Sequence, residues 1–180
     1  VVGQYKYDES GRFIGFIDTD GNTISYANNA TDHSQAITDR LGNETAYIYD
    51  TEGNVTKKTD PLGNVTLWEY DADGNVTKET LPNGAASANT YNSNGDMLTD
   101  TDSLGNTTTY TVNSRGDVLI ETDPLGNVVT NTYDSNGNML TRTDQLGDVT
   151  TNTYDTDGNL ETVTDPLGNT TTYAYDSVGN

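Results

Sequence analysis

The sequence predicts an all-β protein made of tandem β-hairpins in a continuous antiparallel sheet that spirals into a shell or tube. Three observations predict this fold: a strict 21-residue repeat, two turn motifs in each repeat, and alternating side chains in the segments between the turns. Only 31% of the 180 residues are hydrophobic. Because this share lies well below that of ordinary globular domains, a thick core is not expected.

The repeat is marked by Tyr-Asp pairs that lie at multiples of 21 residues from one another. They are Tyr7-Asp8, Tyr49-Asp50, Tyr70-Asp71, Tyr133-Asp134, Tyr154-Asp155 and Tyr175-Asp176, with degenerate copies at Asn28-Asn29, Tyr91-Asn92 and Val112-Asn113. Eight complete units run from Tyr7 to Tyr175 without insertion. We therefore expect residues 1–180 to be a single repeat array, open at both ends, with a divergent first unit. Such an array would be part of a longer array or of a polymer.

Each unit has two turns, and the placement of glycine defines both. Sixteen of the eighteen glycines fall at the two turn phases, and all four prolines share one phase. Asp or Asn first, Pro second and Gly fourth favour a type I turn, in which Gly takes positive φ and forms a β-bulge. The expected structural turn residues are Asp60, Pro61, Gly63, Asn64, Gly74, Asn75, Asp123, Pro124, Gly126, Gly137, Asp165, Pro166 and Gly168.

The segments between the turns are long enough for strands of about six residues, which is the usual strand length in hairpins. Alternation places Thr66, Trp68 and Tyr70 on one face of their strand. The following strand begins with an aliphatic residue such as Val76. The expected structural aromatic column is Tyr47, Tyr49, Trp68, Tyr70, Tyr91, Tyr110, Tyr133, Tyr154, Tyr173 and Tyr175. Where Asn89, Asn131 and Asn152 replace the first aromatic residue, a hydrogen-bonded asparagine ladder is expected as an option.

The Tyr-Asp-x-x-Gly-Asn motif coupled to Asp-Pro-Leu-Gly-Asn resembles the YD repeats of bacterial Rhs and wall-associated proteins, of toxin-complex shells and of teneurins. The resemblance covers essentially the whole chain. It implies a spiral β-sheet shell from a secreted or surface protein, often one that encloses a C-terminal toxin. Rhs-type shells end in an autoproteolytic motif in which an apolar residue follows Asp-Pro-x-Gly. Here Asn64, Asn127 and Asn169 occupy that place.

Composition and charge exclude several classes of function. The formal net charge of −20 argues against nucleic acid as a partner, and no apolar run is long enough for a membrane span. The absence of cysteine removes disulfides and thiolate chemistry. Asp32, His33 and Ser34 are residue types of a catalytic triad, but adjacent residues in a turn cannot converge as a relay. We therefore expect no enzyme, no catalytic residue and no cofactor.

Two ligand classes stay open. Asp18-Thr19-Asp20-Gly21-Asn22, with its counterparts at Asp71 and Asp155, superficially resembles a calcium loop, so calcium at the Asp-rich turns is a weak alternative to plain turn formation. Sequons begin at Asn29, Asn43, Asn54, Asn64, Asn75, Asn106 and Asn169, which makes glycosylation an option. Exposed aromatic side chains could also stack against sugars.

The sequence thus predicts a non-enzymatic structural protein that forms the wall of an extracellular tube, filament or shell. The expected partners are other copies of the chain or adjacent repeats of a longer chain. The first alternative is a segment of a cocoon that encapsulates a toxin cargo. The second alternative is a cell-surface adhesin or carbohydrate-binding module, with glycans as partners.

Overall fold

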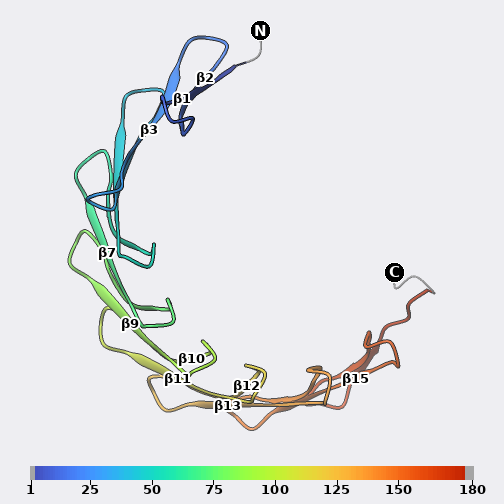
Figure 1. Ribbon diagram of the computed structural model, residues 1–180. Coiled ribbons are helices and arrows are strands. Elements are labelled where there is room, and N and C mark those ends of the chain that lie inside the picture. The colour runs from blue at the N-terminus through green and yellow to red at the C-terminus, as the bar shows by residue number, and fades with distance from the viewer. Residues whose placement is uncertain (1–2, 177–180) are drawn as a thin grey trace. The chain divides into compact units, whose positions relative to one another are not determined.

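The computed structural model describes residues 3–176, which contain only β-strands, turns and short connections. The chain divides into two compact units, residues 1–87 and 88–180, and the division falls within β9 (Ala86–Tyr91). Each unit is a meander in which every strand pairs antiparallel with its neighbour in sequence (Figure 1). The predicted hairpin repeat is therefore confirmed.

The strands of the first unit alternate with tight turns and are mostly five or six residues long. They are β1 (Gln4–Tyr7), β2 (Phe13–Ile17), β3 (Thr23–Asn29), β4 (Ser34–Thr38), β5 (Glu44–Tyr49), β6 (Val55–Thr59), β7 (Val65–Tyr70) and β8 (Val76–Thr80). This unit is coloured from blue to green in Figure 1.

The second unit follows the same plan with less variation in strand length. After β9 come β10 (Met97–Thr101), β11 (Thr107–Val112), β12 (Val118–Thr122), β13 (Val128–Tyr133), β14 (Met139–Thr143), β15 (Val149–Tyr154), β16 (Leu160–Thr164) and β17 (Thr170–Thr172). Six-residue and five-residue strands alternate from β9 to β16. Strands of constant length follow directly from the unvarying repeat.

Two kinds of hairpin alternate along the chain. In β13–β14, Thr132 pairs with Thr141 and Tyr133 with Met139, so Leu140 is an extra residue in β14. In β14–β15 the register is regular, with Thr143 opposite Val149. The bulge that follows each Tyr-Asp turn adds one residue to the second strand. The extra residue lies in the ten-residue step from Asp134 to Asp144, whereas the eleven-residue step from Asp144 to Asp155 contains the longer strand β15.

The sheet has no conventional core. Within residues 3–176 no hydrophobic, polar or charged side chain is fully buried. In β7, Thr66, Trp68 and Tyr70 are half-buried, whereas Leu67 and Glu69 between them are exposed. This is the predicted alternation, and in β7 it places Thr66, Trp68 and Tyr70 on one face and Leu67 and Glu69 on the other. Stability must therefore come from contacts along the sheet and across neighbouring strands.

The divergent first repeats differ in both packing and turn geometry. The rings of Tyr5 and Phe16 lie 5.3 Å apart, and those of Phe13 and Tyr26 lie 5.4 Å apart, in tilted arrangements. The turn between β3 and β4 has no bulge, because Asn29 pairs directly with Ser34. His33 adopts positive φ there, at 47°. The divergent sequence at Asp32-His33, where other turns have Gly-Asn, thus corresponds to a different type of hairpin loop.

No helix in residues 3–176 has the length and apolarity needed to cross a membrane.

Candidate functional site

Most turns are closed by aspartate in the same way, as the turn at Asp123 illustrates. Its carbonyl accepts the N–H of Gly126 at 2.9 Å, and its own N–H donates to the carbonyl of Asn127 at 2.9 Å. Its Oδ1 accepts the N–H groups of Leu125 and Asn127, both at 2.8 Å. The Asn127 side-chain amide donates to its Oδ2 at 2.6 Å. One carboxylate therefore holds both sides of the turn, as an Asx turn does.

These hydrogen bonds favour the ionised carboxylate. The side-chain amide of Asn127, followed by backbone N–H groups, lowers the pKa of Asp123 against a smaller opposing effect of burial. The pKa is lowered in the same manner at Asp18, Asp39, Asp50, Asp60, Asp71, Asp102, Asp155 and Asp165. A backbone N–H is the largest cause of the lowered pKa at Asp8 and Asp134, from Arg12 and Asn138 respectively. The acidic turns are thus built around charged aspartate.

The glycines named as turn residues all lie in the left-handed region. Gly63, Gly74, Gly126, Gly137 and Gly168 have φ between 84° and 95°. A β-carbon would be strained in this conformation, which explains why the phase is reserved for glycine. Leu125 at the preceding position points into solvent and is 87% exposed.

In several repeats the second tyrosine fastens one strand to the start of the strand before it. Tyr70 at the end of β7 donates its hydroxyl to the carbonyl of Val55, the first residue of β6, at 2.8 Å. The β6–β7 ladder has already ended at the Lys57–Leu67 pair, so the phenol takes a carbonyl beyond the backbone ladder. The same bond joins Tyr133 to Val118, Tyr154 to Met139 and Tyr175 to Leu160, at 3.0 to 3.1 Å. We call this bond the tyrosine latch.

Asparagines at the first aromatic position support the latch. The side-chain amide of Asn131 donates to the carbonyl of Val118 at 3.0 Å, and that of Asn152 donates to the carbonyl of Met139 at 3.0 Å. These two residues therefore do not form the expected asparagine ladder. The expectation was wrong because the bulge turns a main-chain carbonyl within reach of both side chains, and a carbonyl is a good acceptor for an amide.

The remaining aromatic residues of the column are placed by strand alternation. Tyr47, Tyr49, Trp68, Tyr91 and Tyr110 are half-buried, whereas Tyr173 and Tyr175 are 43% and 39% exposed. Trp68 donates its indole N–H to Glu79 at 3.1 Å. Tyr49 donates to the Gln35 side chain at 3.3 Å, because Ser34 begins a divergent strand. The column is thus a set of packing and hydrogen-bonding residues.

Burial raises the pKa of three of these tyrosines, and nearby carboxylates add to the effect. Asp50 does so at Tyr70, Glu121 and Asp100 at Tyr110, and Asp117 at Tyr133. Both causes disfavour the phenolate. The latch therefore depends on neutral tyrosine, whereas the turns depend on ionised aspartate.

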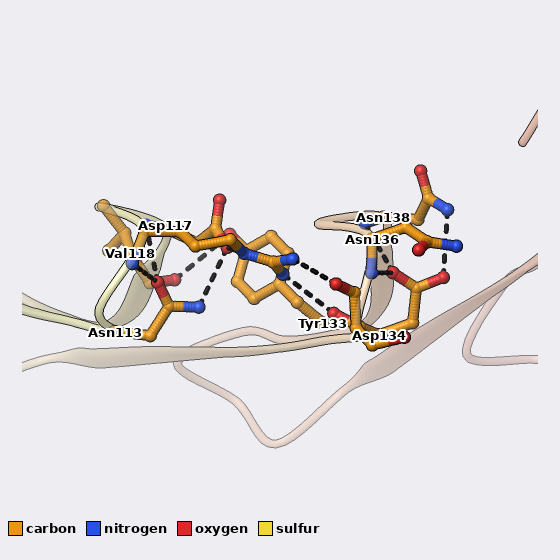
Figure 2. A network of polar contacts seen from close by, with 9 residues as sticks. Asn113, Asp117, Val118, Tyr133, Asp134, Asn136 and Asn138 are labelled. Carbon is orange, nitrogen blue, oxygen red and sulfur yellow. Dashed lines mark hydrogen bonds and ion pairs between the residues drawn. The ribbon is translucent and has the colours of Figure 1, made fainter.

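One arginine joins the turns of two successive repeats (Figure 2). Arg115 donates through Nη2 to the carbonyl of Asp134 at 2.8 Å, and through Nη1 to the carbonyl of Ser135. Its Nε forms an ion pair with Asp117 at 3.2 Å. Figure 2 shows Asn113 and Asp117 of one turn facing Asp134 of the next. The guanidinium thus occupies two turn carbonyls that the β-ladder does not reach.

The other face of the second unit is lined by threonine. Thr132 and Thr141 lie opposite each other with their hydroxyl oxygens 2.6 Å apart, and Thr153 and Thr162 repeat this arrangement at 2.7 Å. In the first unit, Lys78 and Glu69 form an ion pair of 2.8 Å across a hairpin. Cross-strand pairs of both kinds stabilise a sheet by a few tenths to about 1 kcal/mol each.

A sequence model of the RHS repeat family matches residues 18–64, 49–86 and 154–180, which together make up more than half of the chain. The chain belongs to the RHS repeat family. This confirms the resemblance to YD repeats that the two turn motifs carry. No curated protein matches the chain in sequence.

Solved structures of other proteins share the fold of this chain. The chain is similar to the crystal structure of TcdB2-TccC3-TEV, with a TM-score of 0.74 and 18% identity over 99% of the chain. It is equally similar to the structure of TcdB2-TccC3 without the hypervariable C-terminal region, with a TM-score of 0.74 and 18% identity. The chain spans 11% of the length of either structure. At this identity the likeness concerns the fold.

The candidate catalytic and calcium groups lie apart from one another in this RHS array. His33 adopts positive φ at the β3–β4 turn, and the Asn29 amide donates to Asp32 at 2.5 Å. In residues 3–176 no three His, Asp or Glu side chains converge to hold a metal ion. At Asp71, Oδ1 accepts backbone N–H groups and Oδ2 accepts the Asn75 amide. Calcium binding at the Asp-rich turns therefore remains a prediction of the sequence. The carboxylates concerned already accept hydrogen bonds that close their turns.

The tyrosine latch was not found from the sequence alone. Its signal was present, because Tyr70 and Val55 are 15 residues apart, as are Tyr133 and Val118. The bond becomes evident only when the bulge is placed in the register, since the bulge decides which carbonyl faces the phenol. The Arg115 contact has no periodic signal, because the other repeats have no arginine at that turn position.

Proposed function

We propose that this RHS array is a non-enzymatic structural segment that forms the wall of an extracellular tube, filament or shell. The observation that carries the proposal is the tyrosine latch, which joins residues 15 apart in several repeats, from Tyr70–Val55 to Tyr175–Leu160. A sheet without a buried core that is fastened strand to strand is suited to enclosing a space. Identical repeats also impose a constant rotation, which favours spiral closure.

Leucines at one edge of each unit supply a surface for self-association. Leu41, Leu62, Leu104, Leu125, Leu146 and Leu167 are each at least 80% exposed at the tips of the Asp-Pro-Leu-Gly type of turn. The turns at the opposite edge have polar or charged residues at that place, such as Asp73, Asn136 and Asp157. Apolar side chains that are repeated along one edge are typical of an interaction surface. Another copy, or another stretch of a longer array, is the partner that we propose.

The alternative is that the wall belongs to a cocoon around a toxin cargo. The shared fold with TcdB2-TccC3 favours this alternative, and the chain spans 11% of that structure. An adhesin or carbohydrate-binding role would require accessible aromatic rings. The half-burial of most of the aromatic column makes this role less favoured than the wall.

Electron microscopy of the purified chain tests the proposal. Tubes or fibres of uniform diameter would support a structural polymer, and closed hollow particles with internal density would support the cocoon. Short ribbons that never associate at any concentration would contradict the wall for this chain.

A matched pair of variants tests the edge. The double variant Leu125→Glu with Leu146→Glu should abolish association, because it places two charges on the leucine edge. Asn94→Glu with Asn136→Glu places the same charges on exposed tips of the opposite edge, and should leave association intact. Equal effects of the two pairs would show that net charge alone, and not the leucine edge, controls assembly.

A further inference from the structure

One repeat of the second unit lacks the tyrosine of the latch. Val112 stands 21 residues before Tyr133, at the end of β11, and pairs with Val118 as Tyr133 pairs with Met139. Valine has neither the ring nor the hydroxyl that occupy this place in the neighbouring repeats. This repeat therefore retains the strand pairing that surrounds the latch tyrosine elsewhere, but it has no tyrosine at that position.

A cavity of about 300 Å³ lies at this position. Its walls are formed by Met97, Tyr110, Val112 and Val118, with Asp96 and Gly116 at its polar end. The volume is at the lower end of the range of small-molecule sites in proteins, and it is ample for one aromatic ring. All six residues belong to the second unit.

The carbonyl that the missing phenol would reach is that of Met97, 15 residues before Val112. In the equivalent repeats the carbonyls of Val118, Met139 and Leu160 each accept a tyrosine hydroxyl. Among the residues that the structure describes, the carbonyl of Met97 accepts no side-chain hydrogen bond of the kind that the carbonyls of Val118, Met139 and Leu160 accept. The second donor of the later repeats is a side-chain amide, which Asn131 and Asn152 donate to the equivalent carbonyls. Tyr110 stands at this position here, so the amide is missing as well.

We propose that this cavity is a binding site for the tyrosine side chain of another polypeptide, whose hydroxyl donates to the carbonyl of Met97. The chain itself shows the fit, since its own tyrosines fill the equivalent positions with this bond. The apolar walls favour the ring, and the free carbonyl favours a phenol over the plain ring of phenylalanine. The Asp96 carboxylate, held at Oδ2 by the Asn92 amide, disfavours an anionic ligand. The site does not depend on whether the wall closes into a tube or a shell.

The two methionines of the chain allow a direct test. Met97 lines the cavity, whereas Met139 occupies the equivalent place in a repeat where Tyr154 forms the latch. With ¹³C-labelled methionine methyl groups, titration with p-cresol should shift the Met97 signal in a saturable manner. The Met139 signal should not move. Equal shifts of both signals, or none, would overturn the proposal.

Two sets of variants locate the site. Val112→Tyr should fill the cavity and abolish the response of Met97. The double variant Asn152→Tyr with Tyr154→Val copies the pair Tyr110 and Val112 into the later repeat, so p-cresol should then also shift Met139. If the double variant does not fold, Val112→Tyr still decides the matter: a persisting response of Met97 would place p-cresol elsewhere.

The role of the hydroxyl and the source of the phenol are tested with matched probes. Toluene should bind roughly two- to tenfold more weakly than p-cresol if the carbonyl of Met97 accepts a hydrogen bond. N-acetyl-tyrosinamide should compete with p-cresol, and N-acetyl-phenylalaninamide should compete less well. If toluene binds as tightly as p-cresol, the hydrogen bond is refuted. If the blocked tyrosine does not compete, the cavity takes small phenols and not a polypeptide side chain.

Discussion

At the scale of single residues, one aspartate stabilises each acidic turn, because its two carboxylate oxygens accept three hydrogen bonds. At Asp123 these come from the backbone N–H groups of Leu125 and Asn127 and from the Asn127 side chain. Two turns of the second unit use asparagine instead, at Asn92 and Asn113, whose Oδ1 atoms make the same backbone contacts. The geometry thus requires a short side chain with an oxygen, and charge is a second contribution.

We therefore expect Asp123→Ala to lower the urea midpoint of unfolding and Asp123→Asn to lower it less. The alanine variant removes both side-chain acceptors of the turn, whereas the asparagine variant keeps Oδ1 for the two backbone N–H groups. Equilibrium urea titrations followed by circular dichroism measure the difference. A midpoint for the asparagine variant as low as that for alanine would show that the charge, and not the acceptor geometry, holds the turn.

Gly126 separates backbone strain from side-chain crowding. Its φ is 84°, and a β-carbon built there would meet nothing within 4 Å. Gly126→Ala should therefore destabilise the array by about 1–2 kcal/mol, from the left-handed conformation alone. Gly126→Asn should cost less, because asparagine tolerates that conformation. Chemical unfolding of the two variants measures this, and equal losses would mean that any β-carbon is rejected.

At the scale of strands and hairpins, the stability of a repeat depends on how many side chains donate to the carbonyl that the tyrosine latch uses. The carbonyl of Val118 accepts both Tyr133 and Asn131, whereas in the described chain that of Val55 accepts Tyr70 as its one side-chain donor. Trp68, which occupies the position of Asn131, donates to Glu79 instead. Similar repeats are thus held by different numbers of bonds.

Removing the hydroxyl should accordingly cost more at Tyr70 than at Tyr133. Tyr70→Phe leaves the carbonyl of Val55 without a side-chain donor and should cost about 1–2 kcal/mol. Tyr133→Phe leaves Asn131 in place and should cost about 0.5 kcal/mol. Both variants keep the ring, so packing is preserved. The free energies of unfolding from urea titrations give the comparison, and the reverse order would show that Asn131 does not support the carbonyl.

The Arg115 contact predicts a local effect between turns. Arg115→Lys keeps the charge but not the planar fork that reaches the carbonyls of Asp134 and Ser135. Amide hydrogen exchange at residues 134–138 should therefore become faster. Exchange in the turn at residues 155–158 serves as the internal control, because Asn136 stands in the preceding repeat at the position of Arg115. Unchanged exchange at residues 134–138 would contradict an ordering role.

Elements could be predicted from the sequence where the cause is local. A turn is specified by residues three apart, such as Asp123 and Gly126, and alternation needs only one strand, as in Thr66, Trp68 and Tyr70. The latch could not be predicted, because it depends on which residue the bulge adds to the ladder. The asparagine ladder failed for the same reason, since Asn131 reaches a carbonyl that only the register reveals. The cavity beside Val112 likewise could not be predicted, because the missing tyrosine matters only once the tyrosine latch of the other repeats is known.

At the scale of the whole molecule, the absence of a buried core in the described chain leaves stability to many small and repeated contacts. Turn aspartates favour the folded state when they are ionised, and the half-buried tyrosines Tyr70, Tyr110 and Tyr133 favour it when they are neutral. These two sets titrate at opposite ends of the pH scale. Because each set recurs along the array, small contributions at single repeats add up over the chain.

Stability should therefore be greatest on a plateau around neutral pH and fall on both sides. The folded pKa of the turn aspartates lies below 3.8, so their contribution is complete above 3.8 and is lost as the pH falls through the folded pKa. The folded pKa of Tyr70, Tyr110 and Tyr133 lies above 10.0, so their contribution is complete below 10.0 and is lost as the pH rises through it. Urea midpoints measured from acid to alkaline pH, with phenolate absorbance on the alkaline side, test both limbs. Tyr133→Phe should weaken the alkaline limb and Asp123→Asn the acid limb, and an unchanged profile in both variants would assign the pH dependence to other groups.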